Sequence, residues 1–167
     1  MDFNWLAVLV AALVPTVIGF VWYHPKVMGT AWMKAADMTE EKMKGANMGL
    51  IFGLSFLFSL MLAVEVNFLA IHQMNIPGIF VGADGASPSP DSEAGKYLAD
   101  FMAKYGSIHR TWSHGIVHGI INALFFALPI LATNAMFERK GWKYILVNFG
   151  YWLITIAVMC TIVCAWV

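Results

Sequence analysis

The chain has 167 residues, of which 60% are hydrophobic and only 12% are charged, and its formal net charge at pH 7 is zero. A soluble domain normally has about 25% charged residues, so most of this surface must face something other than water, and a lipid bilayer is the expected partner. The balanced charge and the lack of a basic run give no reason to expect a nucleic-acid partner.

Four stretches are long and apolar enough to cross about 30 Å of hydrocarbon, which takes about 20 helical residues. They lie at residues 5–23, 48–71, 114–136 and 144–166. Each must be helical, because lipid offers no hydrogen-bond partner to free backbone groups. The sequence therefore predicts one all-α domain over residues 1–167, a polytopic membrane protein with four transmembrane helices in an antiparallel bundle.

The first stretch begins without a basic segment or a small-residue cleavage site, so we interpret it as a retained span rather than a signal peptide. Asn4 is the expected helix cap, and Pro15 is the expected position of a kink. After His24 and Pro25 break the span, apolar residues recur at helical spacing, which predicts a short interfacial helix. Thr39, followed by two glutamates, predicts the start of a further helix.

The connection between the second and third spans, residues 72–113, is turn-rich from Ile76 to Pro90. Over residues 91–105 the apolar side chains share one face, and Gly106 is a suitable end signal. This pattern predicts an amphipathic helix on the membrane surface. The helix either simply packs as part of a long connection or acts as a lid.

The basic residues predict the orientation of the spans. The first and third connections hold seven of them and the middle connection three, offset there by acidic residues. The positive-inside rule places the first and third connections in the cytoplasm. Both termini and the middle connection are then extracytoplasmic. The seven are Lys26, Lys34, Lys42, Lys44, Arg139, Lys140 and Lys143, against Lys96, Lys104 and Arg110 in the middle connection.

Small residues recur at every fourth position in three of the spans, which allows helix backbones to approach closely within a membrane. These rows can pack the bundle of one chain, or one row can face another copy in a homo-oligomer. With three rows on four helices, we expect at least one to form a subunit interface. The rows are Gly45, Gly49 and Gly53, then Gly115, Gly119, Ala123 and Ala127, then Ala157, Thr161 and Ala165.

Glu65, His114, His118 and Asn122 are polar residues at membrane depth, where a charged side chain costs about 2.5–3.5 kcal/mol. Glu65 lies about 9 Å below the outer boundary and His118 about 7 Å below it, at 1.5 Å per residue. His114, His118 and Asn122 share one helix face. If the glutamate and the imidazoles meet, they could bind a divalent metal such as zinc, relay protons, or line a pocket for a ligand head group. Alternatively, they only fix helix register.

The remaining chemistry-bearing residues point to no enzyme class. No serine–histidine–acid spacing, glycine-rich phosphate loop or CxxC motif is present, so no catalytic residue and no cofactor is assigned. We interpret Cys160 and Cys164 as packing residues, with a mixed cysteine, histidine and glutamate metal site as the remote alternative. His24, His72 and His109 lie at or near span ends and are interpreted as interfacial.

Several segments resemble one known family. The residues that carry the likeness are 4–11, 22–25, 31–34, 137–143 and 148–152. They resemble the bacterial membrane proteins known as domain of unknown function 1761, and the likeness covers nearly the whole chain. The resemblance implies a compact four-span protein of the inner membrane, and it implies no activity.

From the sequence we expect a non-enzymatic integral membrane protein that self-associates and acts as a structural or accessory component. The alternative is a small transporter, channel, or ligand- or metal-binding module that uses Glu65, His114, His118 and Asn122. A metal-dependent membrane enzyme built on the same residues is the third hypothesis.

Overall fold

The computed structural model describes residues 3–82 and 85–167, and within these ranges the chain is helical and has no β-strand. Four helices are long and apolar enough to cross a membrane, which confirms the predicted fold class. Their ends differ from the predicted ones by one or two residues. They are α1 (Trp5–Trp22), α4 (Met48–Ala70), a third helix made of α7 (Trp112–Asn122), the π-helical turn η3 (Ala123–Ala127) and α8 (Leu128–Phe137), and α9 (Trp142–Ala165).

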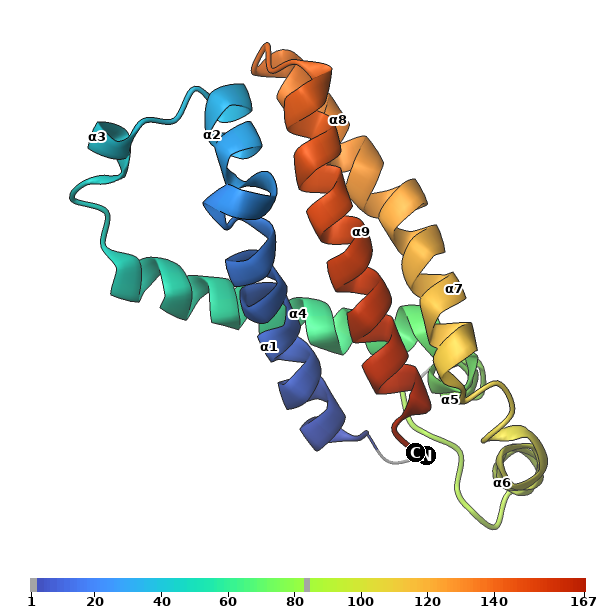
Figure 1. The fold of residues 1–167 in the computed structure, drawn as a ribbon. Helices are drawn as coiled ribbons and strands as arrows, with labels where there is room; N and C mark the ends of the chain where they lie inside the picture. Colours follow the sequence, from blue (N-terminus) through green and yellow to red (C-terminus); the bar gives the residue numbers. More distant parts are fainter. Residues whose placement is uncertain (1–2, 83–84) are drawn as a thin grey trace.

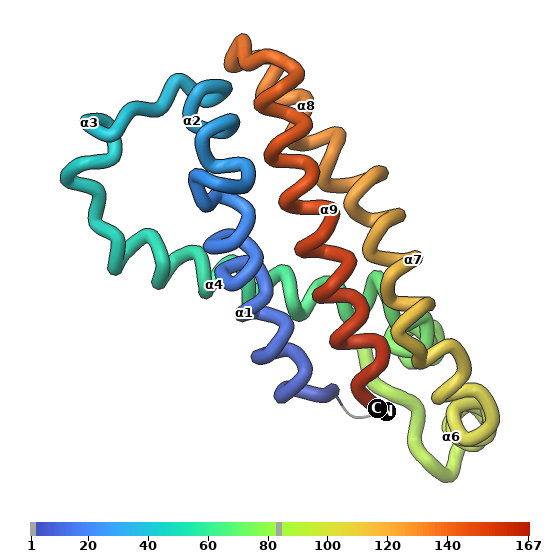
Figure 2. The backbone as a smooth tube through the Cα atoms, in the orientation of Figure 1, coloured from blue at the N-terminus to red at the C-terminus, as the bar shows by residue number. Residues whose placement is uncertain are grey.

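Helix α9 is the centre of the arrangement, because α1, α4 and α7 all pack against it. In Figure 1, α1 and the α7–α8 helix flank α9 and run in the opposite direction to it. Helix α4 crosses behind α1 and α9 at a steep inclination, and its path is clearest in the tube of Figure 2. The bundle therefore has three aligned helices and one oblique helix.

Both predicted caps are present, Asn4 at the start of α1 and Thr39 at the start of the short helix α3 (Glu40–Met43) in the first connection. Asn4 Oδ1 accepts a hydrogen bond from Ala7 N at 3.0 Å, and Thr39 Oγ1 accepts one from Lys42 N at 3.3 Å. These side chains bind amide groups that the first helical turn leaves free. The short elements of the connections are η1 (Pro25–Gly29), α2 (Thr30–Ala36), α3, η2 (His72–Met74), α5 (Ile76–Ile79) and α6 (Glu93–Tyr105).

Polar side chains tie the end of α1 to α9. Trp22 Nε1 donates to Val147 O at 3.0 Å, and Tyr23 Oη donates to Asn148 Oδ1 at 2.8 Å. Burial raises the pKa of Tyr23, so its hydroxyl stays protonated and remains a donor. These contacts fix one end of α1 against the central helix.

Helices α7 and α9 approach each other through glycines. A Cβ atom placed on Gly119 would lie 2.3 Å from Ala157 Cα, and one on Gly115 would lie 2.6 Å from Thr161 Cα. No real side chain fits at those distances, so both positions require glycine. The small-residue rows of the third and fourth spans therefore pack against each other within one chain.

The row in the second span behaves differently. A Cβ atom on Gly53 would meet nothing within 4 Å, and one on Gly49 would meet only its neighbour Asn47 at 3.6 Å. Residues 48–58 are exposed on every side of α4. Within the described part of the chain this half of α4 is exposed, and its Phe52 ring meets that of Phe20 on α1 with centroids 5.6 Å apart.

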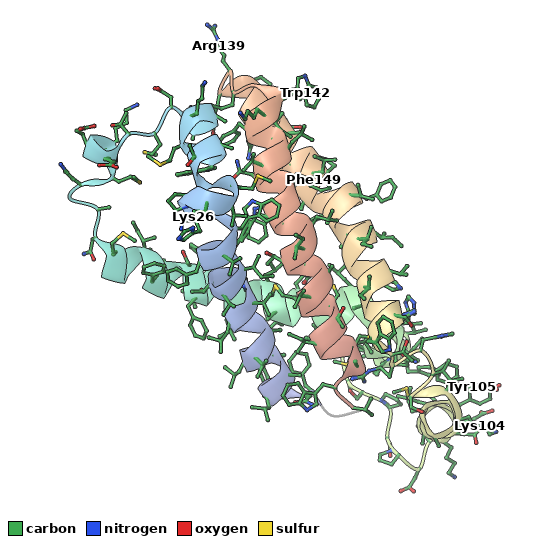
Figure 3. All side chains as sticks on the ribbon, in the orientation of Figure 1. Lys26, Lys104, Tyr105, Arg139, Trp142 and Phe149 are labelled. Atoms are coloured by element: carbon green, nitrogen blue, oxygen red, sulfur yellow. The ribbon has the colours of Figure 1, made fainter. Side chains whose placement is uncertain are left out.

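The outer surface of the bundle is apolar. Large side chains such as Phe20, Leu50 and Phe125 are exposed around the helices, as the sticks in Figure 3 show for the molecule as a whole. Soluble proteins rarely expose such continuous apolar surface. Together with the four apolar helices, this surface identifies a multi-pass membrane protein.

The close approach of α7 and α9 can be tested with a single methyl group. We expect Gly119→Ala to destabilise the protein by about 1–3 kcal/mol, because the added carbon must push the α9 backbone away. The measurement is thermal unfolding in detergent. Gly53→Ala adds the same methyl group where nothing is within 4 Å, so it should leave the midpoint unchanged or raise it slightly. Equal midpoints for the two variants would contradict the packing.

Candidate metal centre

Three histidines meet where the end of α4 joins the start of α7. His72 lies in η2, directly after α4, and His114 and His118 lie one turn apart on α7. The helix spacing puts the latter two rings on one face, and Ile71 in extended conformation turns the chain so that His72 comes back toward α7.

The three rings form a triangle. Their centroids are 4.4 Å apart for His114 and His118, 4.7 Å for His72 and His118, and 5.1 Å for His72 and His114. One ring nitrogen from each lies within 4.8 Å of the other two. A tetrahedral zinc site with Zn–N bonds of about 2.0–2.1 Å needs its nitrogens about 3.3 Å apart, so the rings would have to move closer together to hold an ion.

One atom of the cluster is unsatisfied. His114 Nε2 is buried and has no hydrogen-bond partner among the residues that the structure describes. A buried polar nitrogen without a partner costs about 1–3 kcal/mol, and native proteins rarely leave one. A metal ion at the centre of the triangle would give this nitrogen a ligand bond.

His109 adds a fourth imidazole at the edge of the cluster. Its ring stacks on His114 with centroids 5.2 Å apart and planes 19° apart. It lies outside the group of three nitrogens that could share an ion. Its backbone has a φ of +63°, a left-handed conformation that non-glycine residues rarely adopt.

Arg110 holds the connection that carries His109. Its guanidinium donates from Nε to Cys164 O at 2.7 Å and from Nη2 to Trp166 O at 3.0 Å. These carbonyls end α9 and have no partner within the helix. Burial lowers the pKa of Arg110, although a guanidinium remains charged in proteins. The charged side chain therefore caps α9 and places the adjacent histidine.

Gln73 holds the turn that carries His72. Its Nε2 donates to Ile108 O at 2.7 Å and to Tyr105 O at 3.1 Å, which joins η2 to the end of α6. A cavity of about 310 Å³ lies between these two segments, beside the cluster. Its lining is His72, Gln73, Ile76, Phe101, Tyr105, Ile108 and His109.

The structure separates the four residues that the sequence grouped. His114 and His118 lie in the triangle, and Asn122 Nδ2 donates to the backbone oxygen of His118 at 2.8 Å. Glu65 is exposed and makes no hydrogen bond or ion pair within the described residues. It is not among the groups close enough to share an ion.

His72 and His109 are cluster residues that the sequence reasoning had interpreted as interfacial. The sequence feature that could have identified His72 is its depth in the membrane, because His72 follows the second span and His114 opens the third at the same boundary.

The two cysteines do not join the cluster. Cys160 is fully buried in the core, and the Cys164 thiol lies 3.5 Å from His109 O.

A family model described as protein of unknown function (DUF1761) matches residues 6–164. No curated protein and no solved structure matches the chain.

The role of Arg110 can be tested without metal. We expect Arg110→Met to lower the thermal midpoint in detergent and to speed hydrogen exchange over residues 106–111, because hydrogen bonds from a charged donor contribute about 1.5–3 kcal/mol. Arg139→Met is the matched control, since Arg139 is exposed in the turn before α9. Indistinguishable variants would show that the guanidinium does not anchor this connection.

Proposed function

This chain belongs to the family described as protein of unknown function (DUF1761), so its role must be inferred from its own residues. We propose that it is a membrane module that binds a divalent transition-metal ion through His72, His114 and His118. The observation that carries this proposal is the triangle of imidazoles, in which one nitrogen of each ring lies within 4.8 Å of the other two; the buried Nε2 of His114, which has no hydrogen-bond partner within the described residues, supports it.

The ligand atoms favour a particular class of metal. Imidazole nitrogens suit zinc, copper and nickel, whereas magnesium and calcium prefer carboxylate and carbonyl oxygens. No carboxylate lies in the group of three. We therefore propose zinc or a neighbouring late transition metal as the bound ion.

The ligand count favours exchange over permanent storage. Closed structural zinc sites have four protein ligands, whereas sites with three leave one position for water or another ligand. The cavity beside His72 and His109 gives that position room. A module that captures an ion and passes it on, as a transporter or ligand-binding protein does, fits this arrangement better than a structural site.

We also infer the side of the membrane. Basic residues lie in the connections at the end of the molecule away from α6, and Arg139 and Lys104 mark the two ends in Figure 3. The positive-inside rule then places the histidine cluster and both termini on the extracytoplasmic side. On this proposal, in the cytoplasmic membrane of a bacterium, the cluster would sample metal outside the cell.

The metal proposal predicts stoichiometric binding. Wild-type protein incubated with zinc and then desalted should retain about one ion per chain, measured by elemental mass spectrometry. His114→Ala should lose most of this zinc, because it removes a central ligand. His24→Ala is the matched control, since His24 accepts a hydrogen bond from Lys26 N in the α1–α2 connection, far from the cluster. Wild-type protein without bound zinc, or equal retention by both variants, would refute the proposal.

Self-association as a structural or accessory component is a second proposal, supported by α4. Its half from 48 to 58 is exposed, with only Phe52 in ring contact with Phe20 of α1, and it carries the open positions Gly49 and Gly53. Glu65 on the same helix is exposed and unpaired within the described residues, and a carboxylate facing lipid costs about 2.5–3.5 kcal/mol. A second copy packed on the face with Gly49 and Gly53 would cover the exposed half of α4; Glu65 lies on another side of the helix, since 12 residues turn an α-helix by about 120° beyond whole turns.

Mass measurement in lipid nanodiscs tests self-association. We expect wild-type protein to form dimers or larger assemblies, and Gly53→Leu to shift the population toward monomer, because the larger side chain blocks close approach. Gly78→Leu is the control, since Gly78 also has open space but lies in α5, outside the spans. A wild-type protein that is monomeric at all concentrations contradicts this proposal and leaves the metal proposal unaffected.

A further inference from the structure

A second cavity, of about 470 Å³, lies between α1, α4 and α9, away from the histidine cluster. On α4 it is lined from Phe52 to Leu62, around Ser59, which is the first buried residue of that oblique helix. The cavity is partly open, so it can receive a ligand from the bilayer. Its lining is Pro15, Thr16, Gly19, Phe20, Tyr23, Phe52, Ser55, Phe58, Ser59, Leu62, Tyr151 and Trp152.

Aromatic rings form half of the lining. Phe20 and Phe52 close one part with ring centroids 5.6 Å apart, and Tyr151 lies 5.2 Å from the ring of Tyr23 and 5.0 Å from that of Trp152. Aromatic pairs prefer offset or edge-to-face contact at such distances. The flat ring of a ligand can stack against aromatic walls of this kind.

Unpartnered hydroxyl groups lie among these rings. Ser59 is only 7% exposed, and its hydroxyl has no hydrogen-bond partner within the described residues. Thr16 and Ser55 also line the cavity, and their hydroxyls likewise make no bond in this part of the chain. A serine or threonine hydroxyl in a helix can donate to the carbonyl one turn back, as Thr161 does to Ala157 O, or to an acceptor that a ligand brings. The three hydroxyls are therefore available to a ligand in the cavity.

The tyrosine hydroxyls are already used as donors. Tyr23 Oη donates to Asn148 Oδ1, and Tyr151 Oη donates to Pro15 O, both at 2.8 Å. The free donors of the cavity are therefore the serine and threonine hydroxyls. No lining residue is charged, so a phosphate or carboxylate group would be buried without a counter-charge, which is costly.

From these features we infer that the cavity binds a neutral, flat, lipid-soluble ring that bears carbonyl oxygens, the chemistry of a quinone with an apolar tail. The aromatic walls stack on the ring, Ser59 and its neighbouring hydroxyls donate to the carbonyls, and the tail leaves through the open side into lipid. This site shares no residue with the histidine cluster, so the inference stands independently of metal binding.

Binding of a benzoquinone with a decyl tail tests the inference, measured by calorimetry with the purified protein in detergent. We expect saturable binding at about one ligand per chain. Ser59→Ala should weaken the affinity about five- to tenfold, since it removes one hydrogen bond. Ser113→Ala is the matched control, because Ser113 is exposed at the start of α7 and outside the cavity, and it should bind as wild type does.

A second ligand separates ring recognition from simple filling of an apolar space. Decylbenzene has the same tail and a flat ring without carbonyls, so wild-type protein should bind it more weakly than the quinone. Equal affinity for the two ligands, no saturable quinone binding, or unchanged affinity in a well-folded Ser59→Ala variant would each overturn the inference. His114→Ala should bind the quinone normally even if it no longer binds zinc.

Discussion

The contact between α7 and α9 is the constraint on which the other features depend. Two glycines on α7 remove the side chains that would hold the backbones apart, so Gly119 and Ala157 meet at backbone distance. This contact fixes the start of α7 beside the end of α9. Arg110 can then reach the free carbonyls that end α9, and the rings of His114 and His118 face the end of α4. In lipid, where apolar burial gives little driving force between helices, close packing of this kind supplies the specificity.

The inclination of α4 accounts for both candidate sites. Because α4 crosses the other helices, its buried residues all lie in its second half, from Ser59 to Ala70. The packed end brings His72 to the rings on α7, while the departing end leaves the aromatic cavity beside α1. An α4 aligned with α1 would fill that cavity with its own side chains. One geometric feature therefore creates a polar cluster at one end of α4 and an apolar pocket near its middle.

The sequence predicts the elements well because each depends on local chemistry. Span length follows from apolar runs, and Asn4 and Thr39 act as caps through bonds to residues three positions away. The pairing of His114 with His118 follows from helix periodicity. The sequence does not predict the rotation of α4 about its axis, which leaves Glu65 exposed, or the turn after Ala70 that returns His72 to the cluster. It also cannot show which small-residue rows meet, because that depends on how the helices are placed around α9.

The origin of the ligands bears on how the proposed metal site would work. His114 and His118 are fixed relative to each other by one helix turn, whereas His72 and His109 lie in connections held by Gln73 and Arg110. An ion bound to the helix pair would draw in His72 and give His114 Nε2 the partner it lacks. Since Gln73 joins the same turn to the end of α6, closure around the ion would also restrain the connection between α4 and α7. On the metal proposal, occupancy of the site and the order of that connection would therefore be coupled through the hydrogen bonds that Gln73 donates to the backbone.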